Sequence, residues 1–116
     1  MQQVLYSLGC LYSIRSRIYI AMKIIKVEKS ERKGKKMKAI LDNNTEIHFG
    51  QDGSESYVEG ASKSKRDNYW KRHLGNTTEK NLIENLIMSP SLLSAYVLWN
   101  TPSLEKNIKI LNDRLS

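Results

Sequence analysis

The stretch MKAILDNNTEIHF, residues 37–49, decides the fold that we predict for this chain. Its two ends alternate, wholly or in part, between polar and apolar residues, which is typical of strands with one buried face. The predicted inward positions are Met37, Ala39 and Leu41 on the first strand and Thr45, Ile47 and Phe49 on the second. Asp and Asn tolerate left-handed backbone conformations, so the DNN step between the strands predicts a hairpin turn over residues 41–45.

Further strands and helices extend this hairpin into a complete fold. Ile24, Ile25 and Val27 form a β-branched run that ends at a basic turn around Gly34, which predicts a third strand in meander order. After Gly60 the apolar spacing changes to that of helices. The predicted fold class is therefore α+β, with a small antiparallel three-stranded sheet followed by about four helices.

Capping signals mark the starts of the predicted helices. Ser62 or Ser64 can cap a basic helix that ends at Gly75, and Ser89 and Thr101 each precede a first-turn proline. The helix predicted over residues 76–88 starts like a capping box and carries an apolar stripe of Leu82, Ile83, Leu86 and Ile87. The last predicted helix has an apolar face of Leu104, Ile108, Leu111 and Leu115.

The length of 116 residues and the composition predict one α+β domain over residues 22–116, preceded by an N-terminal extension over residues 1–21. The extension is apolar, but its apolar run is shorter than the roughly 20 residues that span a bilayer. Its arginines follow the apolar part, which is the reverse of a signal peptide. We therefore expect Met22 to be the biological start, residues 1–21 to be a disordered or upstream-translated extension, and the chain to lack a membrane span.

The charge of the chain is basic and unevenly placed, with 19 Lys and Arg against 12 Asp and Glu and a net charge of +7. Residues 23–38, the first basic segment, hold eight Lys or Arg and two Glu. Residues 61–73, the second basic segment, hold five Lys or Arg and one Asp, and the region between the two segments is acidic. Such a balance favours partners such as nucleic acid or another polyanion.

The basic side chains are the sharpest functional signal, because clustered Lys and Arg neutralise phosphates and release counterions. The predicted nucleic-acid-binding residues are Lys29, Arg32, Lys33, Lys35, Lys36, Lys63, Lys65, Arg66, Lys71 and Arg72. Tyr69 and Trp70 can add stacking on exposed bases. The alternative is a solvated basic face with Tyr69 or Trp70 buried in the core, and Trp99 is expected to be a core residue.

Catalytic and metal chemistry find little support in the sequence. His48, Asp52 and Glu55 can be imagined as metal ligands or an acid/base set, but their spacing matches no zinc motif and GQDG is typical of a turn. There is no nucleophile elbow and no glycine-rich phosphate loop, and the single cysteine excludes an internal disulfide. We therefore expect no metal, no cofactor and no catalytic residue, with a metal-dependent nuclease using His48, Asp52 and His73 as the minor enzymatic hypothesis.

Several short motifs occur in the order of a known group of proteins. They are KGKK at residues 33–36, HFG at 48–50, Y-x-x-R-H at 69–73 and L-W-N-x-P-S at 98–103. Together they make residues 23–116 resemble a family of small uncharacterised proteins encoded by large nucleocytoplasmic DNA viruses of algae and amoebae. The family-motif residues are His48, Phe49, Gly50, Gly53, Tyr57, Tyr69, His73, Trp99, Asn100 and Pro102.

One segment departs from this family pattern. Where the family has D-Y-T-x-H-K-D, residues 56–62 read SYVEGAS, so the histidine and both aspartates are missing. The family has no assigned activity, and the resemblance therefore implies a viral origin and a shared fold but no reaction.

The resulting functional prediction is a small basic viral protein that binds DNA, RNA or another polyanion without catalysis. The alternative is a virion structural or host-interaction adaptor protein that uses the acidic region of residues 39–60. Its expected location is the host cytoplasm or virus factory, or the virion itself. The sequence leaves the oligomeric state open.

Overall fold

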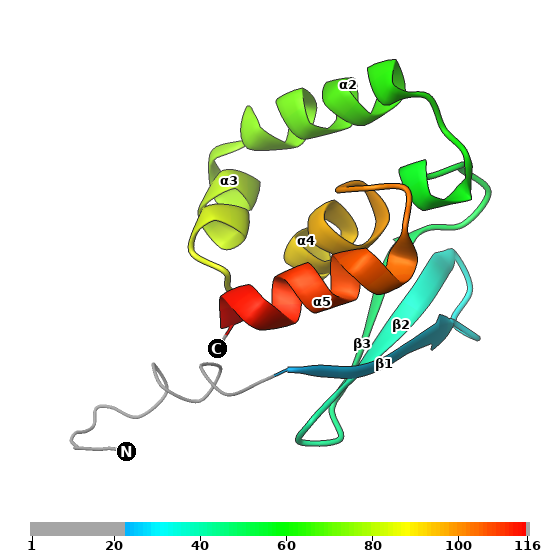
Figure 1. Ribbon diagram of the computed structural model, residues 1–116, viewed down its shortest axis with the longest axis vertical. Coiled ribbons are helices and arrows are strands. Elements are labelled where there is room, and N and C mark those ends of the chain that lie inside the picture. The colour runs from blue at the N-terminus through cyan, green and yellow to red at the C-terminus, as the bar shows by residue number, and fades with distance from the viewer. Residues whose placement is uncertain (1–22, 116) are drawn as a thin grey trace.

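The computed structural model describes residues 23–115, and the expectations for residues 1–21 and for Met22 lie outside them. Three antiparallel strands form one sheet in the order β1-β2-β3: β1 Ile24–Lys29, β2 Lys35–Leu41 and β3 Glu46–Gln51. Two single-turn elements and four α-helices follow, and Figure 1 shows α4 and α5 beside the sheet with α2 on the side away from it. The predicted α+β class is confirmed.

The β2–β3 hairpin follows the predicted alternation. Met37 pairs with Phe49 and Ala39 with Ile47, and Ala39 and Phe49 are fully buried. Asn44 has a φ of 67° in the connecting turn, which is the left-handed conformation expected of the DNN step. Thr45, predicted to face inward, is instead exposed in this turn, because β3 begins only at Glu46.

The helices are η2 Tyr57–Glu59, α2 Lys63–Leu74, α3 Thr77–Glu84, α4 Pro90–Leu93, η3 Ser94–Leu98 and α5 Leu104–Leu115. Ser62 caps α2 by accepting a hydrogen bond from the Lys65 amide, and Ser89 caps α4 in the same way with Pro90 in its first turn. These starts agree with the prediction, because a helix N-terminus is decided by local hydrogen bonds to its first amides.

The end of α3 differs from the prediction, which continued the helix through Leu86 and Ile87. Leu86 has a φ of 54°, and its amide donates to the carbonyl of Ile83 at 3.3 Å. The Ile87 amide donates to the carbonyl of Leu82 at 2.9 Å. These two bonds form a Schellman motif, which normally uses glycine at the left-handed position. Leu86 accepts this position because its side chain packs against the core, a contact that helical spacing alone does not reveal.

The core lies between the sheet and the C-terminal helices. Its fully buried side chains include Leu41, Phe49, Leu92, Leu93, Val97 and Leu111. A smaller cluster of Tyr69, Ile83 and Ala95 joins α2 and α3 to η3. Among residues 23–115, no helix is long and apolar enough to cross a membrane.

Candidate functional site

A cleft of about 400 Å³ lies between one end of the β2–β3 pair and the helices α2, α3 and α4. Side chains distant in sequence meet in it: Lys35 and Lys36 from the first basic segment, Arg72 and His73 from the second, and Trp99 from the L-W-N motif. Gly34 and Gly50 also line it. The cleft therefore collects residues from four of the sequence motifs.

Aromatic stacking builds the α2 wall of the cleft. The ring of Tyr69 lies parallel to that of Trp99, with centroids 4.6 Å apart and an angle of 5° between the planes. The centroid of the His73 ring lies 4.1 Å from that of the Tyr69 ring. Burial, and then the nearby charge of Glu79, raise the pKa of Tyr69 to about 12, so its hydroxyl stays protonated. Since neighbouring rings cover Tyr69, it is a structural part of the wall and not a platform for bases.

Trp70, the second predicted stacking residue, also makes its contacts within the protein. Its indole Nε1 donates to the carbonyl of Trp99 at 2.7 Å, and its ring meets Tyr96 edge-on. The Arg66 guanidinium carbon lies 5.7 Å from the centroid of the Trp70 ring. The expectation that these two aromatics stack on nucleic-acid bases is therefore not supported by their placement.

A histidine and a carboxylate form a fixed pair in the cleft. Nδ1 of His73 lies 2.9 Å from both carboxylate oxygens of Glu79, and Ser91 Oγ donates to Glu79 Oε2 at 3.2 Å. Since a carboxylate only accepts, Nδ1 is the donor and Nε2 is the ring nitrogen left for a ligand. Within residues 23–115, no hydrogen bond to Nε2 is found.

The sequence carries no signal for the part that Glu79 and Ser91 play in this pair. The capping box predicted at the start of the helix over residues 76–88 includes Glu79, and the Glu79 amide does donate to Asn76 Oδ1 at 3.0 Å. Its carboxylate, however, is directed to His73. No spacing rule links residue 73 to 79 across a helix junction, and Ser91 lies in another helix, so neither partner had a sequence signal.

The cations of the cleft differ in how far they are already neutralised. Lys36 Nζ donates to the carbonyl of Ser54 at 2.6 Å and forms an ion pair with Glu59 at 2.9 Å. Lys35 and Arg72 make no ion pair within the described part of the chain, and the Arg72 guanidinium lies 5.9 Å from the Tyr69 ring centroid. Lys35 and Arg72 are therefore the two cleft cations available to an anionic ligand.

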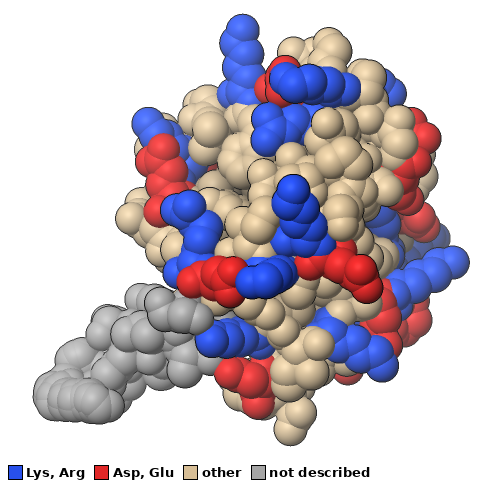
Figure 2. All heavy atoms as spheres, viewed as in Figure 1, with Lys and Arg blue, Asp and Glu red and all other residues tan. Residues whose placement is uncertain are grey.

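The other predicted nucleic-acid-binding residues lie outside the cleft. Lys63 and Arg66 both pair with Asp67 at 3.2 Å, and Arg66 Nε also donates to the carbonyl of Asn100. The remaining five are exposed and make no ion pair within residues 23–115: Lys29, Arg32, Lys33, Lys65 and Lys71. On the face seen in Figure 2, basic and acidic side chains are interspersed, so the chain presents no uniformly basic surface there.

The remaining family-motif residues serve the fold. Phe49 is in the core, Gly53 has a φ of +88° in a turn, and Tyr57 lies half-buried in η2. Asn100 accepts from Arg66 through its carbonyl, and Pro102 is exposed.

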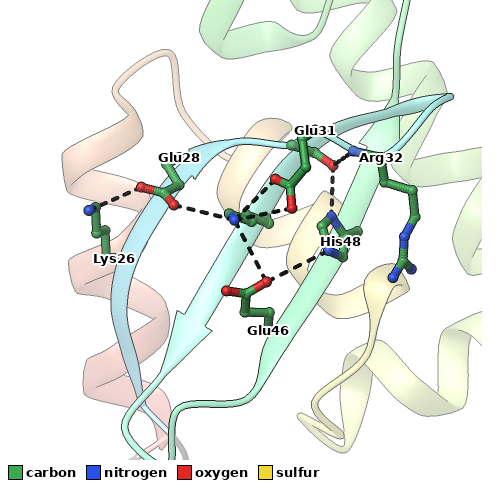
Figure 3. A network of polar contacts seen from close by, with 8 residues as sticks. Lys26, Glu28, Glu31, Arg32, Glu46 and His48 are labelled. Atoms are coloured by element: carbon green, nitrogen blue, oxygen red, sulfur yellow. Dashed lines mark hydrogen bonds and ion pairs between the residues drawn. The ribbon is translucent and has the colours of Figure 1, made fainter.

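His48 belongs to a separate polar network beside β3, where it is buried and its Nδ1 lies 2.7 Å from Ser30 Oγ. Ligand atoms of Glu31, Glu46 and His48 lie within 4.8 Å of one another, a spacing that suits a metal ion. Lys38 Nζ, however, lies 3.0 Å from Glu31 and 3.6 Å from Glu46 and already supplies a cation. Figure 3 shows the carboxylates of Glu28, Glu31 and Glu46 directed toward the ammonium group of Lys38, while the Arg32 guanidinium turns away.

The ligand set suggested by sequence does not assemble. Asp52 accepts a hydrogen bond from the Gly53 amide, as a turn aspartate does, and neither Asp52 nor Glu55 belongs to the cluster around His48. His73 lies in the cleft, whereas His48 and Asp52 do not line it. The structure therefore does not bring the three residues of the nuclease hypothesis together in the cleft.

The network around Lys38 predicts a measurable dependence of stability on pH. A hydrogen bond from Lys26 holds the pKa of Glu28 below 4.5, and a hydrogen bond from Lys38 does the same for Glu31. A carboxyl whose pKa is lowered by folding stabilises the fold above its unfolded pKa, and this contribution is lost as pH falls through the folded value.

We therefore expect the urea midpoint to fall as pH drops below about 4.5, and to fall less in Lys38→Met. Lys106→Met, a change at an exposed lysine of α5, should keep the wild-type profile. Identical acid profiles for Lys38→Met and wild type would show that Lys38 contributes nothing to the dependence of stability on pH.

Comparison with known proteins places the chain among viral sequences. Residues 25–73 match a family of unknown function, DUF5754. An uncharacterised protein of Acanthamoeba polyphaga mimivirus is 34% identical over 80 residues, which cover 65% of this chain and 80% of that relative. No solved structure matches the chain. The expected kinship with an uncharacterised family of giant viruses is confirmed, while the individual motifs stay predictions.

Proposed function

Because the chain belongs to an uncharacterised family of giant-virus proteins, we propose from its own residues that it is a viral protein that binds nucleic acid or another polyanion. The observation that carries the proposal is the meeting of the two basic segments in one cleft. Lys35 and Arg72, which are 37 positions apart, line it together, and neither is neutralised by a described acid. Exposed Lys and Arg outside the cleft would continue the contact along a phosphate backbone.

The alternative role as an adaptor that uses the acidic region of residues 39–60 has less support. Glu46 lies within ion-pair distance of Lys38, and Glu59 pairs with Lys36. Two of the five acids of this region are thus partly neutralised inside the molecule. A polyanion-binding role would place the protein with viral nucleic acid, in the host cytoplasm, the virus factory or the virion.

The test is a salt titration of binding to a fluorescent single-stranded oligonucleotide, measured by anisotropy. Each phosphate contact to a single strand contributes roughly −0.7 to the slope of log K against log salt. For Lys35→Glu/Arg72→Glu we therefore expect a slope that is shallower by about 1.4, and an affinity lower by about ten-fold or more at low salt.

The matched control is Lys80→Glu/Lys106→Glu, which makes the same change in net charge at exposed lysines of α3 and α5. It should retain the slope and most of the affinity. An equal loss in both double variants would remove the cleft from the binding surface. Absence of binding by the wild type at low salt would refute the proposed function.

A further inference from the structure

The cleft holds two cations and one histidine ring nitrogen, which come from two elements and can contact one ligand. They are the ammonium of Lys35 on β2 and the Arg72 guanidinium and His73 Nε2 on α2. The one acid lining the cleft, Glu79, is already bound by His73 and Ser91. Since Lys35 and Arg72 make no ion pair with a described acid, the charge that the cleft offers to a ligand is positive.

The ring of His73 is held in place before any ligand arrives, and Arg72 lies near the same aromatic cluster. Glu79 fixes the ring of His73 through Nδ1, and Tyr69 lies against the same ring at 4.1 Å. The Arg72 guanidinium carbon lies 5.9 Å from the centroid of the Tyr69 ring, which is in turn stacked on Trp99. A site whose donors are already oriented loses little side-chain entropy on binding, which favours a compact ligand with matching acceptors.

Size and lining restrict the kind of ligand. A volume of about 400 Å³ lies in the range of pockets for small molecules, roughly 300–1,000 Å³. Leu98, Trp99 and Pro90 add apolar surface beside the polar groups. The cleft thus suits one nucleotide unit better than a length of duplex.

Charge and acceptor count identify the anionic part of that ligand. A phosphate monoester carries about −1.5 to −2 charges at pH 7 and offers three strong acceptor oxygens, whereas a backbone diester carries a single charge. Arginine binds such groups with two parallel hydrogen bonds, and the lysine ammonium adds a further donor. His73 Nε2 donates to a phosphate oxygen in the imidazolium form of the ring. Two cations beside a histidine ring in one compact cleft match the monoester.

We propose that this cleft recognises a phosphate monoester, the group found at a phosphorylated end of a nucleic-acid strand or on a mononucleotide. The inference rests on the proposed function, because it takes the cleft cations to be phosphate contacts. It adds that the cleft binds the strand end, while exposed Lys and Arg outside it contact the backbone.

The experiment compares oligonucleotides of one sequence that carry a 5′-phosphate, a 3′-phosphate or hydroxyls at both ends. Binding is measured at fixed salt, and a nucleoside monophosphate is added as competitor with the unphosphorylated nucleoside beside it. We expect about ten-fold tighter binding of one phosphorylated strand than of the hydroxyl strand, and competition by the monophosphate alone. Competition by the monophosphate without strand binding would identify a free nucleotide as the ligand and support the monoester site.

Arg72→Gln should abolish the preference for the phosphorylated end, and Lys106→Gln, which removes an exposed charge on α5, should keep it. Equal affinity for all three strands, without competition by the monophosphate, overturns the inference and leaves the proposed function standing. Failure to bind any strand or the monophosphate overturns both. Loss of the preference in both variants would assign it to net charge and also overturn the inference.

Discussion

Asn107→Leu is expected to lower the free energy of unfolding by about 4 kcal/mol, the largest effect that we predict for a single substitution. Asn107 is fully buried in α5. Its Nδ2 donates to the carbonyls of Val97 and Thr101 at 2.8 and 2.9 Å. Its Oδ1 accepts from the Thr101 amide at 3.0 Å and from Thr101 Oγ1 at 2.6 Å. Leucine has a similar volume but makes none of these hydrogen bonds, so the backbone groups of Val97 and Thr101 lose their contacts with residue 107.

The measurement is equilibrium unfolding in urea, with Asn81→Leu as the control. Asn81 is an exposed residue of α3, so its replacement should change stability by no more than about 0.5 kcal/mol. Because Asn107 holds the segment that leads from Trp99 to α5, Asn107→Leu should also weaken oligonucleotide binding under conditions where it still folds. A loss of less than about 1 kcal/mol would mean that the freed backbone groups find other partners.

Gly50→Ala is expected to cost about 3 kcal/mol, because it combines two separate penalties. Gly50 has a φ of +82°, a left-handed conformation that costs an L-residue about 1–2 kcal/mol. A Cβ at this position would also lie 2.9 Å from Leu98 Cδ1 and 3.0 Å from Lys36 Cβ. The crowding adds about 1–3 kcal/mol, as overpacking of a core does.

Gly53 provides the matched control for the second penalty. Its φ is +88°, but a Cβ there meets nothing within 4 Å. Gly53→Ala should therefore cost only the conformational part, about 1–2 kcal/mol. The difference between the two variants in thermal or urea unfolding measures the close approach of β3 to Leu98 and Lys36. Equal losses for the two substitutions would contradict the packing argument.

The relation between sequence and structure differs from element to element in this protein. The β2–β3 hairpin, the Ser62 and Ser89 caps and the apolar face of α5 were all predicted, because each depends on residues within a few positions of one another. The end of α3 was predicted wrongly, since Leu86 takes a left-handed conformation that its local sequence disfavours and that core packing supports.

The candidate site likewise combines features that the sequence predicted with features that it did not. Lys35, Arg72 and His73 were recognised as basic or motif residues, but nothing in the sequence indicated that they line one cleft. The partners Glu79 and Ser91 had no functional signal. For Tyr69 and Trp70 the sequence left base stacking and burial in the core as alternatives, and their contacts in the structure favour the second. Each of these relations joins residues from different elements, where spacing rules do not apply.

The sequence by itself determined the three-stranded hairpin sheet, the helical second half and the two basic segments, because strand alternation, turn chemistry, helix capping and charge are read from neighbouring residues. Only the tertiary structure decided which charges are neutralised and which remain available, and which motifs meet. The reason is physical: a side chain's partners are chosen by how the sheet and helices pack, and that packing brings residues 34 to 99 around one cleft.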